Sequence, residues 1–200
     1  MSFIITVIAM IIAYLIGSVS SAIIVCRLMN LPDPRSQGSK NPGATNVLRI
    51  GGKKAAIITL LGDTLKGFLP VLIVVLLDLN SMTIAAVAFA AFLGHLYPIF
   101  FKFEGGKGVA TAIGTLIAVS WPVSLCWFAT WGIVAALFRY SSLASLTASV
   151  AAPFYIAYFT ADINLIVVYI IMMMLLIIRH RSNIQKLMNG QESKIGEKKK

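Results

Sequence analysis

Carboxylates are scarce in this chain, whose 200 residues contain seven Asp and Glu against 17 Lys and Arg. A glycosidase needs two carboxyl groups flanking the scissile bond, and no such pair stands out in the sequence. Few acids are left to act as a general base. The composition therefore favours substrates that already carry negative charge and an activated leaving group.

Cysteine and histidine are equally sparse, with two residues of each. Cys26 and Cys126 lie in apolar surroundings without a CxxC spacing, and His95 and His180 are far apart in the chain. Zinc sites need clusters of Cys, His or carboxylate ligands. We therefore expect no metal site, and we expect both cysteines to pack as small hydrophobic residues.

Two common site signatures are also missing. The sequence contains no GxSxG, the turn that carries the nucleophile of serine hydrolases. The segment Gly105-Gly-Lys-Gly108 is not a Walker A loop, because its spacing differs and it lacks the Lys-Ser/Thr pair. Neither a serine hydrolase nor a nucleotide-binding site is therefore implied.

Long apolar runs are abundant instead. Hydrophobic residues make up 58% of the chain and the mean hydropathy is +0.89, more than a soluble domain of this length buries in one core. Several runs approach the roughly 20 residues that a helix needs to cross a bilayer. They predict an all-α polytopic membrane protein. The first run lacks a basic leader and is too long for a signal peptide, so we expect it to remain as a span.

About seven transmembrane helices are predicted. In chain order they cover Phe3–Cys26, Ala55–Leu77, Met82–Phe101, Val109–Ser120, Pro122–Phe138, Ser142–Thr160 and Ile163–Ile178. The stretch 109–138 fits either one long tilted span or two short ones that turn at Trp121-Pro122. The distribution of charge favours two.

Basic residues gather in three segments that we expect to be cytoplasmic. They lie between Arg27 and Lys54, at Lys102 and Lys107, and from Arg179 onward. The chain must then cross the membrane an even number of times between Lys107 and Arg179, which requires two crossings within 109–138. This puts the N-terminus outside and the C-terminus in the cytoplasm. It also explains the net charge of +10 without a nucleic-acid partner.

No internal repeat is visible, and we expect one transmembrane catalytic domain over residues 1–190. Residues 191–200 form a polar, basic cytoplasmic tail, which we expect to be disordered near anionic lipid headgroups. Asp63 and Lys66 lie three residues apart inside a predicted span. Charges at membrane depth pair or face a polar cavity. An ion pair that supports the site is one interpretation, and direct contact with a ligand is the other.

Three polar islands interrupt the apolar chain. The first, from Arg35 to Arg49, is rich in Gly, Ser, Thr and Asn. Small residues let the backbone approach a ligand and form anion-binding nests, and both arginines offer forked donors that suit phosphate. A basic loop that only anchors the chain at lipid headgroups is the alternative, but it would not need GSKNPGATN.

In the second island, Gly-Gly-Lys-Gly precedes a predicted helix, as in phosphate-binding loops. A flexible turn is the alternative, which its pairing with the first island disfavours. His95 either orients a loop, which we favour, or touches substrate. The third island starts at Arg179, and His180 and Asn183 share a face there if the helix continues.

Together, GSKNPGATNVLR, GHLYPIFFKFEGGKGVAT and RHRSNIQKLMNGQE resemble the PlsY-type acyl-phosphate:glycerol-3-phosphate acyltransferases of bacteria, in order and along nearly the whole chain. The resemblance implies a seven-helix protein of the bacterial inner (plasma) membrane with active-site loops facing the cytoplasm. It implies transfer of a fatty acyl group from acyl phosphate to the sn-1 hydroxyl of glycerol 3-phosphate. The products would be lysophosphatidic acid and phosphate, in the first step of phospholipid synthesis, without a cofactor or metal.

The same motifs imply roles for single residues. The catalytic residues would be Ser39, Arg49, Lys107, His180 and Asn183. Substrate would also be bound by Asn41, Gly43, Thr45 and Asn46 in the first loop, and by Gly105, Gly106 and Gly108 around the acyl-phosphate headgroup. Two bases are open: a phosphate oxygen of a substrate, which we favour, and His180. The expected partners are glycerol 3-phosphate, long-chain acyl phosphate and membrane lipids, and the soluble enzyme that makes acyl phosphate is a candidate.

Two other classes of protein fit parts of the pattern. A transporter for a phosphate-bearing solute would place its polar groups near the midplane, often in repeated halves, whereas the polar residues here gather on one side. A structural or lipid-binding protein would show basic residues without the Gly/Asn/Thr-rich loops. Only an enzyme would release phosphate from acyl phosphate and glycerol 3-phosphate.

Overall fold

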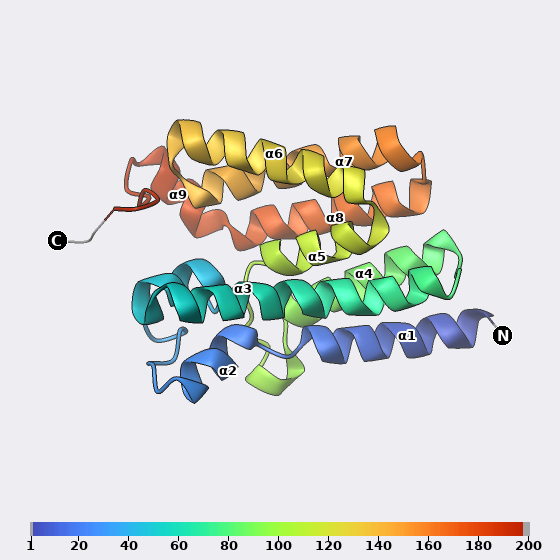
Figure 1. Ribbon diagram of the computed structural model, residues 1–200, viewed down its shortest axis with the longest axis horizontal. Helices are drawn as coiled ribbons and strands as arrows, with labels where there is room; N and C mark the ends of the chain where they lie inside the picture. Colours follow the sequence, from blue (N-terminus) through green and yellow to red (C-terminus); the bar gives the residue numbers. More distant parts are fainter. Residues whose placement is uncertain (1, 198–200) are drawn as a thin grey trace. The chain divides into compact units, whose positions relative to one another are not determined.

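The structure, a computed structural model, describes residues 2–197, in which helices joined by loops are the regular elements and no strand is present (Figure 1). The elements are α1 (Ser2–Gly17), α2 (Ser21–Leu28), α3 (Ala44–Leu76), α4 (Ser81–Leu96), η1 (Ile99–Phe101, a 3-10 turn), α5 (Val109–Val119), α6 (Trp121–Phe138), α7 (Ser141–Thr160), α8 (Ile163–Arg179) and α9 (Arg181–Met188). The prediction of an all-α protein is confirmed. The chain divides into two compact units, an N-terminal unit of residues 1–119 and a C-terminal unit of residues 120–200.

Five helical segments among the described residues are long and apolar enough to cross a membrane. They are Phe3–Leu28, Ala44–Leu76, Ser81–Phe101, Trp121–Phe138 and Ser141–Thr160. Helices α8 and α9 make a sixth if they are counted as one span bent by 60°. Helix α5 is apolar but has only 11 residues. Large apolar side chains such as Phe154 are exposed, as a lipid-facing surface requires.

The first predicted span is broken. We expected one helix over Phe3–Cys26, but α1 ends at Gly17 and α2 starts at Ser21. Lys66 Nζ donates a hydrogen bond of 2.8 Å to the carbonyl oxygen of Val19 within this break. A backbone carbonyl that leaves a helix in apolar surroundings needs such a donor. The buried lysine therefore helps to stabilise the interruption.

The second predicted helix begins too late in our reading. We expected it to start at Ala55, but α3 starts at Ala44, so Arg49 lies on a helix and not in a loop. Gly51 and Gly52 lie between the two starting points. Gly52 takes φ 76° and ψ −174° inside α3, which kinks the chain and lets it continue as a helix.

The remaining boundaries follow from proline and from one break. Helix α4 ends at Leu96, earlier than the predicted Phe101, because Pro98 follows and only the short η1 turn continues. The stretch 109–138 forms two helices, α5 and α6, on either side of Ser120. Two short helices are the alternative that the charge argument favoured.

Helices cross closely within the N-terminal unit. An added Cβ at Gly17 or Gly94 would overlap backbone atoms of the partner in the α1–α4 pair, and one at Gly67 or Gly114 would do so in the α3–α5 pair. Small residues at crossings are typical of helix pairs in membranes. A core around Val71, Val87 and Ala91 fills the contact between these helices. The crossings fix the helix ends from which the polar loops extend.

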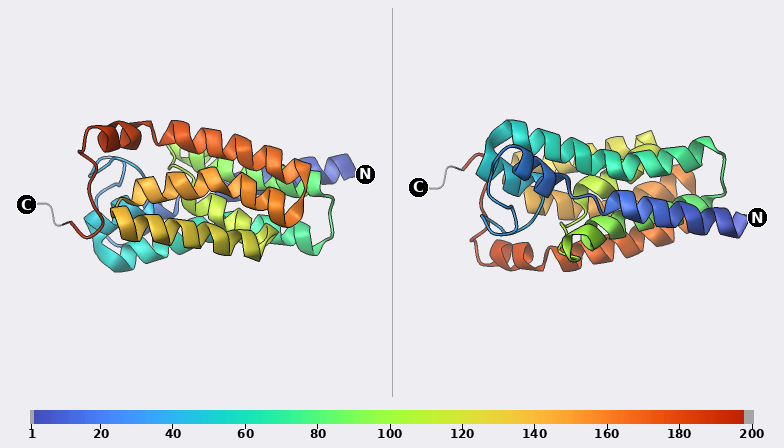
Figure 2. Two further views of the ribbon diagram at one scale, coloured as in Figure 1. Left: turned by 90° about the horizontal axis from the view of Figure 1, so that it is seen from above. Right: turned by 90° about the horizontal axis from the view of Figure 1, so that it is seen from below.

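In the C-terminal unit, α6, α7 and α8 run side by side (Figure 2). Polar side chains bridge α6 and α7: Trp131 Nε1 donates to Ser145 Oγ at 3.1 Å, and the hydroxyls of Thr130 and Tyr155 are 2.6 Å apart. Asp162 caps α8 by accepting from two backbone N–H groups. Such caps and bridges satisfy polar groups where water is scarce.

The described part of the tail contacts the loop between α6 and α7, and its disorder near lipid headgroups stays a prediction. Ile195 N–H donates to the carbonyl oxygen of Arg139 at 2.6 Å, and Arg139 Nη2 donates to the carbonyl oxygen of Ile195 at 3.0 Å. Lys194 Nζ lies 5.8 Å from the centre of the Tyr140 ring. The loop between α6 and α7 therefore holds residues 194 and 195. The end of the predicted tail, residues 198–200, lies outside the described residues.

Candidate active site

The first loop is organised by one buried side chain, that of Asn46. Asn46 is 1% exposed, and its Oδ1 accepts a hydrogen bond of 2.9 Å from the backbone N–H of Ser39. Its Nδ2 donates to the carbonyl oxygens of Pro34 at 2.8 Å and Gln37 at 3.0 Å. One amide thus ties the loop 34–39 to the start of α3. This supports the prediction that Asn46 shapes the first loop.

The predicted ligands of the first loop lie around this amide. Ser39 and Thr45 are exposed, and Arg49 projects from the first turns of α3 as an exposed side chain. Gly43 is the N-cap of α3, and no side chain forms a capping hydrogen bond there. Backbone N–H groups at the start of a helix attract anions. This end of α3 therefore has the chemistry that a phosphate group needs.

Arg35 forms ion pairs with two carboxylates of the protein itself. Its Nη2 lies 2.7 Å from Asp33 Oδ2, and its Nη1 lies 3.2 Å from Glu104 Oε2. We expected a forked phosphate donor at this position, but the guanidinium joins the first loop to the second. Both sides of this clamp are partly exposed, so its contribution to stability is about 1 kcal/mol or less. Its effect is to hold the two loops together.

The Asp33 carboxylate makes this clamp sensitive to acid. Hydrogen bonds from the Arg35 side chain lower the pKa of Asp33 below its usual range. A group with a lowered pKa in the folded state adds stability above its unfolded pKa and loses it as the pH falls through its folded pKa. At neutral pH the free energy of unfolding of the wild type should therefore exceed that of Asp33→Asn by about 1 kcal/mol or less. Unfolding scans down to strongly acidic pH should show this difference disappear, and a difference independent of pH would contradict the assignment.

The glycine loop, Gly105-Gly106-Lys107-Gly108, packs directly on the end of α4. The backbone N–H of Gly106 donates to the carbonyl oxygen of His95 at 3.2 Å. A Cβ added at Gly105 would overlap the carbonyl oxygens of His95 and Leu96, and one at Gly106 would overlap the His95 ring and approach the carbonyl oxygen of Pro42 to 3.1 Å. These glycines are therefore required by close packing. The contact with Pro42 also brings the second island against the first.

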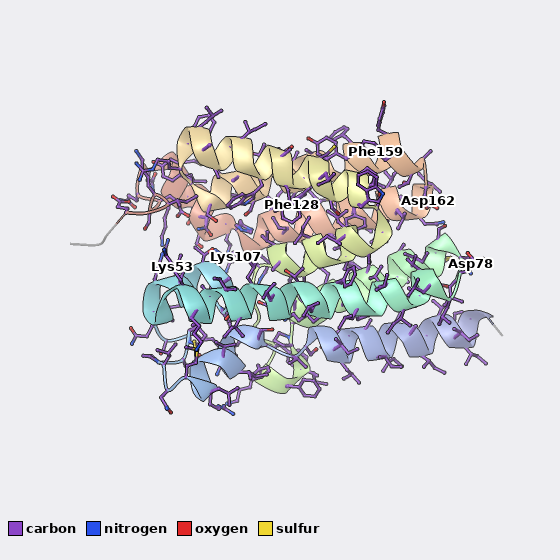
Figure 3. The ribbon with its side chains drawn as sticks, viewed as in Figure 1. Lys53, Asp78, Lys107, Phe128, Phe159 and Asp162 are labelled. Carbon is purple, nitrogen blue, oxygen red and sulfur yellow. The ribbon has the colours of Figure 1, made fainter. Side chains whose placement is uncertain are left out.

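Lys107 follows these glycines and is partly buried. It lies toward the Lys53 end of α3, whereas Asp78 lies at the other end (Figure 3). One end of the N-terminal unit thus contains the Asn46 loop (residues 34–39, held by the Asn46 side chain), the glycine loop and the basic residues 49, 53 and 54. This one-sided distribution agrees with the charge pattern of the sequence.

Beneath the glycine loop lies a buried group of charges. Asp63 Oδ1 is 2.8 Å from Lys66 Nζ, and the two side chains are 3% and 5% exposed. The two residues therefore form an ion pair within α3, and whether it supports the site or contacts a ligand stays a prediction. His95, also buried, places Nδ1 3.8 Å from the same carboxylate oxygen. His95 therefore faces the ion pair on one side and Gly106 on the other.

His180 and Asn183 belong to the C-terminal unit. His180 is 3% exposed, and its Nδ1 lies 2.8 Å from the carbonyl oxygen of Leu176. Since a carbonyl oxygen only accepts, Nδ1 carries the hydrogen, and neutral His180 has its lone pair on Nε2. The helix bends by 60° at this residue. The chain nevertheless continues from His180 as α9, with the carbonyl oxygen of His180 accepting from the N–H of Ile184 at 2.9 Å. A shared face for His180 and Asn183 stays a prediction.

Sequence reasoning missed Glu192 and Ser142. Glu192 Oε1 accepts hydrogen bonds of 2.7 Å from both Asn183 Nδ2 and Ser142 Oγ. This carboxylate orients the Asn183 amide and joins α9 to α7. Glu192 closes the third motif, so its position was visible in the sequence. Its distant partner Ser142 was not, because nothing local relates residues 50 positions apart.

Glu192→Ala should therefore lower activity by about tenfold, since the buried Ser142 hydroxyl and the partly buried Asn183 amide would lose their acceptor, and the full cost of about 1–3 kcal/mol applies only to a buried group. Glu192→Gln should retain most of the activity, because its amide oxygen can accept both hydrogen bonds. Steady-state kinetics of both variants, compared at matched fractions of folded protein, test this difference. Equal losses in the two variants would mean that the charge, and not the acceptor, is what matters.

Within residues 2–197, no three His, Cys, Asp or Glu side chains are grouped so that they could hold a metal ion. The N-terminal unit brings together Asn46, the backbone of Ser39, Pro42, Gly105, Gly106 and His95. The roles toward substrate remain predictions for every residue of the expected site: Ser39, Asn41, Gly43, Thr45, Asn46, Arg49, Gly105, Gly106, Lys107, Gly108, His180 and Asn183. So does the approach of the third motif to the first two.

Known proteins match the chain along nearly its whole length. The profile of the family described as glycerol-3-phosphate acyltransferase matches residues 7–190. A glycerol-3-phosphate acyltransferase of Methylococcus capsulatus is 56% identical over 187 residues, which are 94% of each chain. One of Ralstonia nicotianae is 57% identical over 199 residues, or 98% of this chain and 96% of its own.

Solved structures match as well. The crystal structure of PlsY (YgiH), an integral membrane glycerol 3-phosphate acyltransferase, in its glycerol 3-phosphate form has a TM-score of 0.92 and 41% identity, and the match covers 96% of both chains. The lysophosphatidic acid form of PlsY has a TM-score of 0.89 and 40% identity, with 96% of this chain and 95% of that chain covered. The chain belongs to the glycerol-3-phosphate acyltransferase family of integral membrane enzymes.

Proposed function

We propose that this enzyme transfers a fatty acyl group from acyl phosphate to the sn-1 hydroxyl of glycerol 3-phosphate, giving lysophosphatidic acid and inorganic phosphate. The observation that carries the proposal is the junction of the Asn46 loop with the Gly105–Gly106 loop at one end of the N-terminal unit. Two anionic substrates need two such loops side by side. The glycerol 3-phosphate and lysophosphatidic acid forms of the solved relative support the acceptor and the product.

The reaction needs little acid or base catalysis from the protein. The hydroxyl oxygen of glycerol 3-phosphate attacks the acyl carbonyl carbon, and the bond from that carbon to the phosphate oxygen breaks. Acyl phosphate is a mixed anhydride, so phosphate leaves without strong acid help. Lys107, Arg49 and backbone N–H groups stabilise the developing oxyanion and the leaving phosphate. Holding both substrates together lowers the entropic barrier further.

The hydroxyl proton goes to a phosphate oxygen of a substrate in the mechanism that we favour. His180 is the alternative base, through the Nε2 lone pair left by its hydrogen bond to Leu176. His180→Gln keeps a hydrogen-bonding side chain that does not titrate. It should retain most of kcat if substrate phosphate is the base. Loss of kcat with unchanged binding of glycerol 3-phosphate would assign the base to His180.

The donor and the position of acylation are tested with the purified protein in detergent. Acyl phosphate, acyl-coenzyme A and acyl carrier protein are each offered with glycerol 3-phosphate, and phosphate and lysophosphatidic acid are measured. Product should form from acyl phosphate alone, in equal amounts with phosphate. Proton NMR of the product should show acylation at the terminal methylene. Product formed directly from a thioester donor would contradict the proposal.

We further propose seven spans in the bacterial inner membrane, with the N-terminus outside and the site facing the cytoplasm. The absence of Lys and Arg from the turns at Asp78, Trp121 and Asp162 supports this orientation. Single cysteines placed at Ser39, Lys107 and His180, in a chain with Cys26 and Cys126 replaced, should all be protected from an impermeant thiol reagent in intact cells. Labelling of some of these positions from outside would overturn the topology.

The membrane also sets how substrate arrives. A long-chain acyl phosphate would enter from the inner leaflet, with its tail among the apolar helices and its phosphate at the basic end. Glycerol 3-phosphate would come from the cytoplasm. The soluble enzyme that makes acyl phosphate would supply the donor, either at this protein or through the lipid.

A further inference from the structure

Three ionisable side chains lie buried together under the glycine loop. Asp63 and Lys66 come from α3 and His95 from the last turn of α4, and each residue is 6% exposed or less. Thr111 on α5 adds a hydrogen bond of 3.0 Å from its hydroxyl to the carbonyl oxygen of Asp63. Lys66 also donates to Val19, in the break between α1 and α2. The cluster thus joins α3, α4, α5 and the break between α1 and α2.

Stability alone does not explain such a cluster. Removing two charges from water costs about as much as their attraction returns, and well-packed apolar side chains of the same size are often as stable. A buried ion pair does fix geometry, because its partners satisfy each other in only one arrangement. The Asp63–Lys66 pair therefore gives His95 one defined neighbour, at 3.8 Å from its Nδ1.

The other edge of the His95 ring reaches the glycine loop. A Cβ on Gly106 would overlap Nε2 of His95 and would lie 2.9 Å from its Cε1. The backbone of the same histidine accepts the Gly106 N–H at 3.2 Å. His95 thus contacts Gly106 through its ring and through its carbonyl group. A movement of the ring would move the loop that carries Lys107.

We infer that His95, anchored by the Asp63–Lys66 ion pair, is a positioning residue that holds Gly105-Gly106-Lys107 in the geometry that binds the acyl-phosphate headgroup. The inference rests on the proposed function, since it assigns the acyl donor to this loop. His95 does not touch substrate in this scheme. It acts through Gly106, and the ion pair acts through His95.

Two substitutions of His95 test the contacts of the two edges of its ring separately. His95→Asn keeps a donor near Nδ1 for Asp63 but removes the atoms beside Gly106. His95→Gln reaches toward Gly106 but has no group at Nδ1. Each should raise the KM for acyl phosphate by about tenfold and leave the KM for glycerol 3-phosphate unchanged. A role in folding alone would reduce the amount of active enzyme and would change neither KM.

A size exchange tests the contact directly. Gly106→Ala pushes against the His95 ring, and the shorter side chain of His95→Asn makes room for the added methyl. The double variant should therefore be no worse than Gly106→Ala alone, whereas independent effects would multiply. Multiplied losses would overturn the proposed contact.

Thr83→Val provides the matched control. Thr83 is buried on the same helix as His95 and forms hydrogen bonds with Thr6 and Asn80, but it lies at the other end of α4. It should lower thermal stability and keep both KM values of wild type. Should both His95 variants fail to fold, Thr111→Val removes only the hydrogen bond to Asp63 and should raise the KM for acyl phosphate by about threefold.

The outcomes distinguish the two proposals. Wild type that releases no phosphate from acyl phosphate rejects the proposed function, and this inference falls with it. Wild type that is active, with an unchanged KM for acyl phosphate in the folded variants, rejects the positioning role of His95 alone. A selective rise in the KM for acyl phosphate supports both.

Discussion

Replacing Asn46 by aspartate should lower kcat/KM for glycerol 3-phosphate by at least about 100-fold. The two side chains have the same shape, so the change introduces no cavity. Asn46 Nδ2 donates to two backbone carbonyl oxygens, those of Pro34 and Gln37. A carboxylate oxygen at that position would face both carbonyls as an acceptor, without a hydrogen to offer. The loop that carries Ser39 would then lose its anchor and be repelled.

The expected size follows from the number of hydrogen bonds. A buried group that loses its partner costs about 1–3 kcal/mol, and here two carbonyl oxygens lose theirs. A 100-fold loss corresponds to about 2.7 kcal/mol, which lies within the sum. Part of the loss should appear as a lower melting temperature and part as a higher KM for glycerol 3-phosphate, because the loop serves both the fold and the site.

Asn80→Asp is the matched control for this substitution. Asn80 caps α4, and its Oδ1 accepts from the backbone N–H and the hydroxyl of Thr83 at 2.9 and 3.1 Å. Aspartate can accept both hydrogen bonds and is an equally good N-cap. Asn80→Asp should therefore keep wild-type kinetics and stability. Equal behaviour of the two Asn→Asp variants would show that the amide of Asn46 does not organise the loop.

The sequence predicted the apolar helices well and their interruptions poorly. Hydropathy defines a span because lipid contact is an average over many residues, so α6, α7 and α8 agree with the prediction within a residue or two. The break at residues 18–20 depends on Lys66, which is remote in sequence and donates to Val19. Local patterns do not report such a partner. The early start of α3 escaped notice because Gly52 kinks the helix without ending it.

The same distinction holds for the candidate site. Short motifs indicated the two loops and the Asp63–Lys66 pair, since each depends on residues close together in the chain. The sequence did not indicate that Arg35 binds Glu104, or that Glu192 binds Ser142. Those pairs join segments that are remote in sequence and that only the fold brings together. Arg35 and Asn46, two polar residues expected to serve the site, hold its loops, and contact of Asn46 with substrate stays a prediction.

Gly108→Ala should abolish most activity, with kcat/KM for acyl phosphate lower by at least about 100-fold. Gly108 has φ +91°, a backbone conformation that residues with a side chain rarely adopt and that costs them about 1–3 kcal/mol. An added Cβ would also overlap the Phe92 ring and lie 2.8 Å from Leu96 Cδ1, and overpacking of this kind costs a further 1–3 kcal/mol or so. The backbone must move to relieve both.

That movement would reach the site on both sides of the residue. The carbonyl oxygen of Gly108 accepts the N–H of Ala112 at 2.8 Å in the first turn of α5, and Lys107 precedes it. The start of α5 and the lysine would therefore shift together. The loss should affect acyl phosphate more than glycerol 3-phosphate, because the Asn46 loop keeps its own hydrogen bonds.

Gly132→Ala is the matched control for Gly108→Ala, because it makes the same chemical change at a glycine that has open space around it. Gly132 lies inside α6, and a Cβ there meets no atom within 4 Å. Alanine should raise helix stability by about 0.5–1 kcal/mol and leave both KM values unchanged. Thermal unfolding of the two variants should show opposite shifts, and only Gly108→Ala should change the kinetics. A Gly108→Ala enzyme with normal stability and normal use of acyl phosphate would mean that the conformation of this loop does not govern donor binding.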